Sequence, residues 1–205
     1  MTSALSAERD SVSAIPAEER LRANLYMLLG GLLSRAPNGD ILNATAQIEG
    51  DDSPLGRAIS TLARVAERTR PETVAQEYHD LFIGLGRGEL VPFGSYYLTG
   101  FLNEKPLAVL RKDMARLGIA RPSHVKEPED HVAALLDMMG GLITGAFGDP
   151  TPLDEQKRFF KQHLEPWAAH FFRDLEGAKA SLFYAPVGTV GRALIEIETR
   201  AFEMD

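Results

Sequence analysis

Apolar residues recur along most of the chain at steps of three and four, the spacing that gathers them on one face of an α-helix. The strongest run comprises Val132, Leu135, Leu136, Met139 and Ile143. No segment sustains the alternation of apolar and polar positions that indicates a strand. We therefore expect an all-α fold, a single-domain bundle of about nine or ten helices over residues 16–205. Residues 1–15 are rich in Ser and Ala and are predicted to form a disordered leader.

Prolines and glycines predict several helix boundaries. Pro71 should open a helix that runs to about Leu85, since a first helical position needs no N–H donor. Gly118 should end the helix that runs from Asn103 to Leu117. The last helix should start near Val187. In the first helix, the pair Gly30-Gly31 costs about 1 kcal/mol per residue against alanine. Close approach of another helix would offset that cost.

The segment that begins at Glu127 joins ionisable residues to the strongest apolar helix. Pro128 is expected at the first helical position, which puts Asp130 in the first turn near the positive end of the helix dipole. His131 is expected to be half-buried beside the apolar face. Neighbouring helical residues point about 100° apart, so Asp130 and His131 should each contact another segment. The pair is a candidate hinge between two parts of the fold.

Composition narrows the possible functions. The chain has 205 residues and no cysteine, which excludes disulfides, zinc–thiolate sites, iron–sulfur clusters and a thiol nucleophile. The net charge of −7 disfavours nucleic acid and favours cationic partners. The longest apolar run covers about nine residues, whereas a membrane span needs about 20. The first residues lack the features of a secretory signal, so we expect a cytoplasmic protein without membrane insertion.

The candidate catalytic and ligand motifs are weak. The glycine-rich loop 84–88 has no preceding strand and no Gly-Lys-Ser/Thr, so a tight turn is favoured over phosphate binding. Glu127 and His131 have the spacing of metal ligands on a helix, but no third ligand is evident and no metal is predicted. The pairs His79-Asp80 and Asp130-His131 lack a recognisable nucleophile. The residues alone favour a helical binding module over an enzyme. Aromatic residues after the loop should pack in the core; they are Tyr96, Tyr97 and Phe101.

Three motifs in order resemble the TorD/DmsD/NarJ family of chaperones that mature molybdenum-containing redox enzymes. The first is Glu77-Tyr78-x-x-Leu81-Phe82-x-Gly84, followed by Gly88, Pro92 and Tyr96. The second is Glu127-Pro128-x-Asp130-His131. The third is Phe159-Phe160-x-x-His163-Leu164-x-Pro166-Trp167-x-x-x-Phe171. The match departs after Pro92, where relatives often have an aromatic residue and Glu-Ser but this chain has Phe93-Gly94-Ser95. The glutamate that relatives have at this place is therefore absent, and Glu89 or Glu104 could supply its negative charge.

The resemblance implies an all-helical cytoplasmic chaperone. It would bind the twin-arginine signal peptide of an oxidoreductase catalytic subunit and hold that subunit until cofactor insertion and export. It would carry no cofactor of its own, with transient contact with the client molybdopterin or GTP left open, and would be a monomer or a domain-swapped dimer. One alternative is a NarJ-type chaperone of a non-exported enzyme. Another is a helical nucleotide-binding or hydrolytic enzyme that uses His79, Asp80, Asp130 and His131.

The resemblance places peptide binding or gating at the corner around Asp130 and His131. Asp130 would receive a client arginine or hold the linker 118–126, and His131 would position the groove wall. The full set of expected peptide-binding or gating residues is Tyr78, Phe82, Pro92, Phe93, Tyr96, Glu127, Asp130 and His131. Burial of four leucine-sized side chains would supply about 6–12 kcal/mol, against about 4–15 kcal/mol for association and ordering. Apolar contacts should therefore set affinity, while charge sets partner choice.

Overall fold

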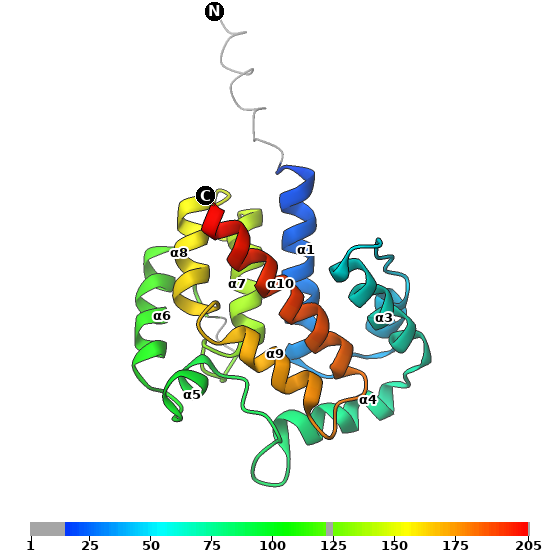
Figure 1. Ribbon diagram of the computed structural model, residues 1–205. Coiled ribbons are helices and arrows are strands. Elements are labelled where there is room, and N and C mark those ends of the chain that lie inside the picture. The colour runs from blue at the N-terminus through cyan, green and yellow to red at the C-terminus, as the bar shows by residue number, and fades with distance from the viewer. Residues whose placement is uncertain (1–14, 122–124, 205) are drawn as a thin grey trace, which may run out of the picture.

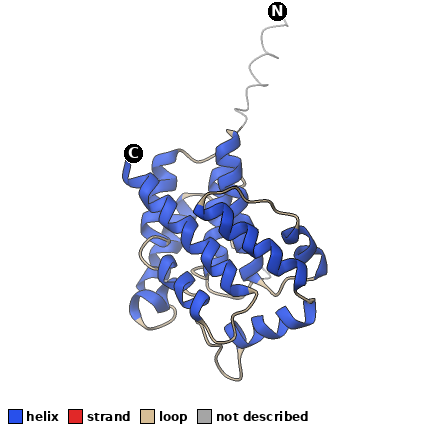
Figure 2. Ribbon diagram, turned by 45° about the vertical axis from the view of Figure 1, so that its right-hand side comes forward, coloured by secondary structure: helices blue, strands red, loops and turns tan. Residues whose placement is uncertain are grey.

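A computed structural model describes residues 15–121 and 125–204. This part of the chain folds into helices joined by loops (Figures 1 and 2), so the predicted all-α class is confirmed. The elements are α1 (Ala17–Ser34), α2 (Gly39–Ala46), α3 (Pro54–Arg68), α4 (Pro71–Tyr78), the π-helical turn η1 (His79–Ile83), α5 (Gly94–Thr99), α6 (Lys105–Arg116), α7 (Val132–Thr144), α8 (Leu153–His163), α9 (Ala168–Gly177) and α10 (Tyr184–Met204). The predicted leader falls almost wholly on residues 1–14, outside the described ranges.

Helix α7 forms the centre of the core and packs most extensively against α1. Ten of its 13 residues are buried. Two glycines allow the close approach: a Cβ on Gly140 would lie 3.0 Å from Met27 Cγ, and one on Gly30 would lie 2.2 Å from Asp137 Oδ1. The expected close contact is thus confirmed at Gly30. It is wrong at Gly31, where a Cβ would meet nothing within 4 Å.

The remaining helices enclose this pair. Helix α10 packs on α9 and α3, and α3 packs on α2; α10 crosses in front of α7 in Figure 1. Two aromatic residues of the third sequence motif, Trp167 and Phe171, are buried in the core together with the neighbouring Phe172 of α9. Tyr97 stacks beside Trp167 with ring centroids 5.4 Å apart. Phe101 does not join them, since it is 70% exposed, and its predicted place in the core is wrong.

Helix boundaries follow the sequence signals only in part. Gly118 ends α6 as expected, with a φ of 71° and a hydrogen bond from Ile119 N–H to Met114 O. The helix from Pro71 continues to Ile83, close to the predicted end, but its last turn is π-helical. The loop 84–88 is the expected tight turn, with positive φ at Gly84 and Gly86.

The last helix begins at Tyr184, three residues before the predicted start near Val187. The cause is Glu77 of α4, whose buried carboxylate accepts hydrogen bonds from the N–H groups of Leu182, Phe183 and Tyr184 at 2.7–3.0 Å. A carboxylate at a helix N-terminus satisfies free N–H donors and complements the helix dipole. A side chain distant in sequence therefore fixes this boundary.

None of the helices in the described residues combines the length and apolar character needed to cross a membrane.

Candidate functional site

Two short extended segments, residues 92–94 and 130–132, pair at the start of α7, and we call this pairing the crossing. Phe93 and His131 form an isolated antiparallel bridge, held by hydrogen bonds from Gly94 N–H to Asp130 O (2.9 Å) and from Val132 N–H to Pro92 O (2.8 Å). The rings of Phe93 and His131 meet edge to face, with centroids 5.0 Å apart. This crossing ties the loop before α5 to the start of α7. Asp130 and His131 thus each contact another segment, as expected, and their role as a hinge stays a prediction.

Asp130 does not occupy the first turn of α7. That helix begins at Val132, one turn after Pro128, so the predicted helix start is wrong. Asp130 is 3% exposed, and its Oδ2 accepts a hydrogen bond from Ser95 N–H at 2.7 Å. The carboxylate therefore satisfies a free donor in the first turn of α5, from a residue 35 positions away. The competing tertiary partner overrides the local helix signal.

His131 is the N-cap residue of α7. Its extended backbone ends the crossing, and its Nδ1 accepts a hydrogen bond from Ala133 N–H at 3.2 Å. This bond requires an unprotonated Nδ1, so a neutral ring carries its proton on Nε2. Burial lowers the pKa of His131 to about 4, although Glu127 and Asp130 act in the opposite direction. The imidazole is therefore neutral near pH 7, and half-buried as predicted.

A pocket of about 510 Å³ opens beside His131, and we call it the α7 pocket. Tyr78 of α4 and Phe82 of η1 contribute aromatic rings to its lining, and α7 contributes Ala133, Ala134, Asp137 and Met138. Its lining residues are Ser34, Tyr78, Phe82, Ile83, Pro92, Phe93, Met114, Ile119, Ala120, Arg121, Val125, Glu127, Pro128, Glu129, His131, Ala133, Ala134, Asp137, Met138 and Phe147. Six of the eight predicted site residues are among them. Asp130 and Tyr96 are the two that are not.

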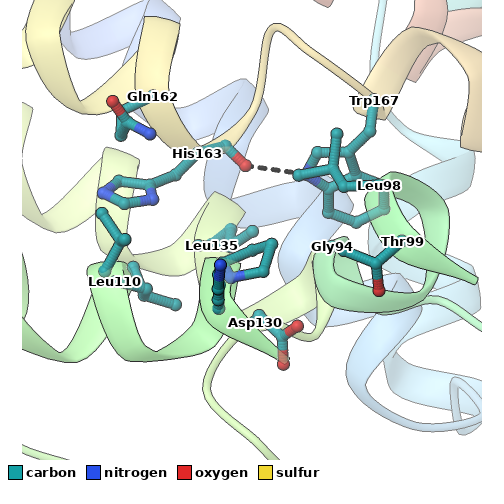
Figure 3. A pocket seen from close by; sticks show the side chains of 12 residues that line it. Gly94, Leu98, Thr99, Leu110, Asp130, Leu135, Gln162, His163 and Trp167 are labelled. Carbon is teal, nitrogen blue, oxygen red and sulfur yellow. Dashed lines mark hydrogen bonds between the residues drawn. The ribbon is translucent and has the colours of Figure 1, made fainter. Parts of the chain in front are cut away.

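Asp130 instead lines a second pocket, of about 360 Å³, between α5, α6 and α8 (Figure 3). Across it lie His163 and Trp167, where the indole N–H donates to His163 O at 2.7 Å. His163 Nε2 lies 2.9 Å from Asp113 Oδ2. Asp130 and His131 are adjacent in sequence, yet they contribute to different pockets on either side of the crossing. Tyr96 lies apart from both and packs under Arg87, with its ring 5.1 Å from the guanidinium.

Acidic groups dominate the charge of the α7 pocket. Glu129 is already paired: its Oε2 accepts from Arg111 at 2.8 and 3.0 Å, and its Oε1 lies 3.7 Å from Arg121 Nε. Burial opposes ionisation of Glu129, but the bonds from Arg111 prevail and lower its pKa. Asp137 projects from α7, and desolvation raises its pKa to about 6 although the side chain retains solvent access. The α7 pocket is therefore lined by two further acids, Glu127 and Asp137, together with aromatic side chains.

Sequence reasoning missed Asp137, Arg121 and Phe147 as pocket residues. Only Asp137 carried a signal, because it is the single charged residue in the apolar run of α7. The two acids suggested as replacements for the missing motif acid do not line the α7 pocket. Glu89 instead accepts hydrogen bonds from Lys179 N–H and Ala180 N–H at 2.7 and 3.1 Å, and Glu104 immediately precedes α6.

The arrangement offers little for catalysis. His79 and Asp80 are exposed neighbours, with 3.4 Å between Nδ1 and Oδ1, and Asp130 lies in a different pocket from His131. Among the described residues, no three histidine, aspartate or glutamate side chains gather as a metal ion would require. What the α7 pocket provides is an apolar concave surface with carboxylates, which suits a ligand that is both apolar and cationic.

The sequence is similar to known proteins of one family. The family model described as "Nitrate reductase delta subunit" matches residues 48–173. A Chaperone protein TorD from Photobacterium profundum is 31% identical over 67% of this chain and 69% of its own. The Vibrio atlanticus Chaperone protein TorD is 27% identical over 87% of this chain and 93% of its own.

The fold also has a solved counterpart. The crystal structure of an Archaeoglobus fulgidus protein, described as a redox enzyme maturation protein, superimposes with a TM-score of 0.56 at 20% identity, covering 85% of this chain and 93% of that one. At this identity the likeness concerns the fold alone. Taken with the sequence matches and the three motifs, it leads to one conclusion: the chain belongs to the nitrate reductase delta subunit family, the TorD/DmsD/NarJ family of redox-enzyme maturation chaperones.

Proposed function

We propose that this chain is a cytoplasmic molybdoenzyme maturation chaperone that binds the twin-arginine signal peptide of its client in the α7 pocket. It holds the immature catalytic subunit until the cofactor is inserted and export can proceed. The observation that carries the proposal is the composition of the pocket. Aromatic and aliphatic side chains form its walls, and two acids without ion-pair partners among the described residues accompany them.

The pocket matches the two chemical halves of such a leader. Its apolar walls suit the hydrophobic part of the peptide, and each leucine-sized side chain buried there contributes about 1.5–3 kcal/mol. Its acids suit the basic part. The volume of about 510 Å³ is typical of a ligand pocket, but a complete leader is larger. A short segment therefore enters while the remainder follows the surface, and micromolar affinity is expected once ordering costs are included.

Calorimetric titration with leader peptides tests this proposal. A panel of twin-arginine leaders from molybdoenzymes should include at least one that binds in the micromolar range. Phe82→Ala should weaken that binding about tenfold, because it removes an aromatic wall of the pocket. Phe101→Ala removes a ring of the same size that is exposed outside the pocket, and should leave affinity unchanged. Absence of binding by every leader at high micromolar concentration, with a folded sample, would refute the proposal.

The family match supports a second client class. Its model is described as a nitrate reductase delta subunit, which favours a chaperone that assembles a respiratory enzyme without exporting it. The client segment would then be an uncleaved N-terminus lacking a twin-arginine motif. Competition between the two peptide classes for the wild-type protein decides the question, since the correct class should displace the other at equal concentration.

A further inference from the structure

Asp137 is the only charged residue of α7, the most buried helix of the described chain. The fold makes room for its carboxylate specifically. Gly30 of α1 lies opposite, and a Cβ there would stand 2.2 Å from Asp137 Oδ1 and 2.9 Å from Asp137 Cγ. Any larger residue at position 30 would displace the carboxylate. The two central helices therefore meet around an acid that faces the α7 pocket.

This carboxylate has no ion pair or side-chain hydrogen bond with the described residues. Glu129 in the same pocket is paired with Arg111 and Arg121. For Asp137, desolvation is the only cause of the raised pKa, with no cation or donor to oppose it. The residue is exposed, so water solvates the carboxylate in the free protein and a cation that enters the pocket can reach it. An accessible acid with a raised pKa and no internal partner, lining a pocket, is typical of a binding site.

Apart from Glu127, the other charged and titratable groups of the pocket are either neutral or already paired, so a cation that binds Asp137 meets no free positive charge among the described residues. Burial and the charge of Glu127 raise the pKa of Tyr78, so its phenol is neutral. His131 is neutral near pH 7. Arg121, the arginine among the described residues that line the pocket, lies 3.7 Å from Glu129 Oε1. The charge of Glu127 raises the pKa of Tyr78 and opposes the lowering of the pKa of His131, whereas desolvation is the cause of the raised pKa of Asp137.

We propose that Asp137 is the specificity-determining residue that receives a basic side chain of the client segment, an arginine guanidinium in the case of a twin-arginine leader. The inference rests on the proposed function and deepens it. The guanidinium is planar and weakly hydrated, so it can pass along the aromatic wall of Tyr78 and Phe82 and still pair with a carboxylate through two parallel hydrogen bonds. Asp137 thereby selects peptides that place a cation beside their apolar segment.

A proton should leave the protein when the cation binds. Free Asp137 holds its proton up to about pH 6. A bound cation favours the carboxylate and lowers that pKa, so binding near pH 6 releases a proton. Affinity for a cationic peptide should therefore fall as the pH decreases from 7.5 to 5.5. An uncharged peptide of the same shape should show neither effect.

Calorimetry with one leader peptide, and the same peptide with both arginines replaced by glutamine, tests the assignment. In wild-type protein at pH 7.5 the arginine peptide should bind about tenfold more tightly, which corresponds to about 1.4 kcal/mol. Asp137→Asn should abolish that preference and leave the glutamine peptide unaffected. Asp137→Glu should restore part of it. Asp52→Asn, an exposed substitution outside the pocket, should retain the full preference.

The wild-type protein provides an independent measurement. Binding heats at pH 6 in two buffers of different ionisation enthalpy should reveal proton release with the arginine peptide only. Equal affinity of Asp137→Asn and wild type for the arginine peptide, or binding without proton release, would overturn the role of Asp137 while leaving leader binding intact. If no peptide binds the wild type, leader binding itself fails, and the assignment fails with it.

Discussion

Glu77 offers the sharpest test of how this fold is held together. Its carboxylate is 6% exposed and accepts three hydrogen bonds: Oε1 from Leu182 and Tyr184 N–H, and Oε2 from Phe183 N–H. These donors belong to the first turn of α10 and the residues before it, 105–107 positions further along the chain. One side chain of α4 thus fixes where the longest described helix begins.

Glu77→Gln keeps the size of this side chain and removes its charge. One amide oxygen can still accept two hydrogen bonds, while the amide NH₂ must face a third N–H donor. Hydrogen bonds to charged groups contribute about 1.5–3 kcal/mol each, and an unsatisfied buried donor costs about 1–3 kcal/mol. We expect a loss of about 3 kcal/mol in the free energy of unfolding. At this chain length each kcal/mol corresponds to about 2–4 °C, so the melting temperature should fall by roughly 6–12 °C.

Urea and thermal unfolding followed by circular dichroism provide the measurement, and Glu89→Gln provides the matched control. Glu89 also accepts two backbone N–H groups, of Lys179 and Ala180, but it is exposed. Water can replace its contacts, and this change should cost less than about 1 kcal/mol. A Glu77→Gln variant as stable as wild type, or a Glu89→Gln variant equally destabilised, would refute the argument that burial of the carboxylate makes the difference.

Two further predictions concern the helix pair and the crossing. Gly31→Ala, whose Cβ meets nothing within 4 Å, should stabilise the protein by up to about 1 kcal/mol. Gly30→Ala should be about 1 kcal/mol less stable than Gly31→Ala, because its Cβ displaces the exposed end of Asp137 and lies 3.2 Å from Ala133 O. A Gly30→Ala variant that melts at the same temperature as Gly31→Ala, or above it, would contradict this. Burial lowers the pKa of His131 from 6.5 to about 4. As the pH decreases from 6.5 to 4, His131 therefore becomes protonated in the unfolded chain but not in the folded protein. The free energy of unfolding should fall over this interval, by at most about 3 kcal/mol. His131→Asn keeps an N-cap acceptor without a titrating group, and its urea midpoint should decline less than that of wild type over this interval, since Asp137 titrates in both proteins.

The helices were predictable because their signals are local. The apolar spacing of α7 and the proline at the start of α4 act within a few residues, and Gly118 ends α6 through its own backbone freedom. The three ordered motifs indicated the family before any coordinates did. The motif residues Tyr78, Phe82 and His131 line one pocket, and their role in peptide binding stays a prediction.

Failures occurred where a distant partner outweighed the local signal. Asp130 has the residue type and position of a first-turn acid, yet it bonds to Ser95 N–H, and the helix starts after it. Phe101 has the size of a core residue but lies on the surface at the end of α5. In both cases the sequence gives no indication of which segments meet.

The sequence by itself determined the helical class, several helix boundaries and the family, because periodicity, turn residues and ordered motifs are properties of short segments. Only the tertiary structure decided that Asp130 and His131 line different pockets and that Asp137 faces one of them without a partner among the described residues. It also decided that Glu77 sets the start of α10. The physical reason is that hydrogen-bond satisfaction and desolvation depend on which groups meet in space, and those groups lie far apart along the chain.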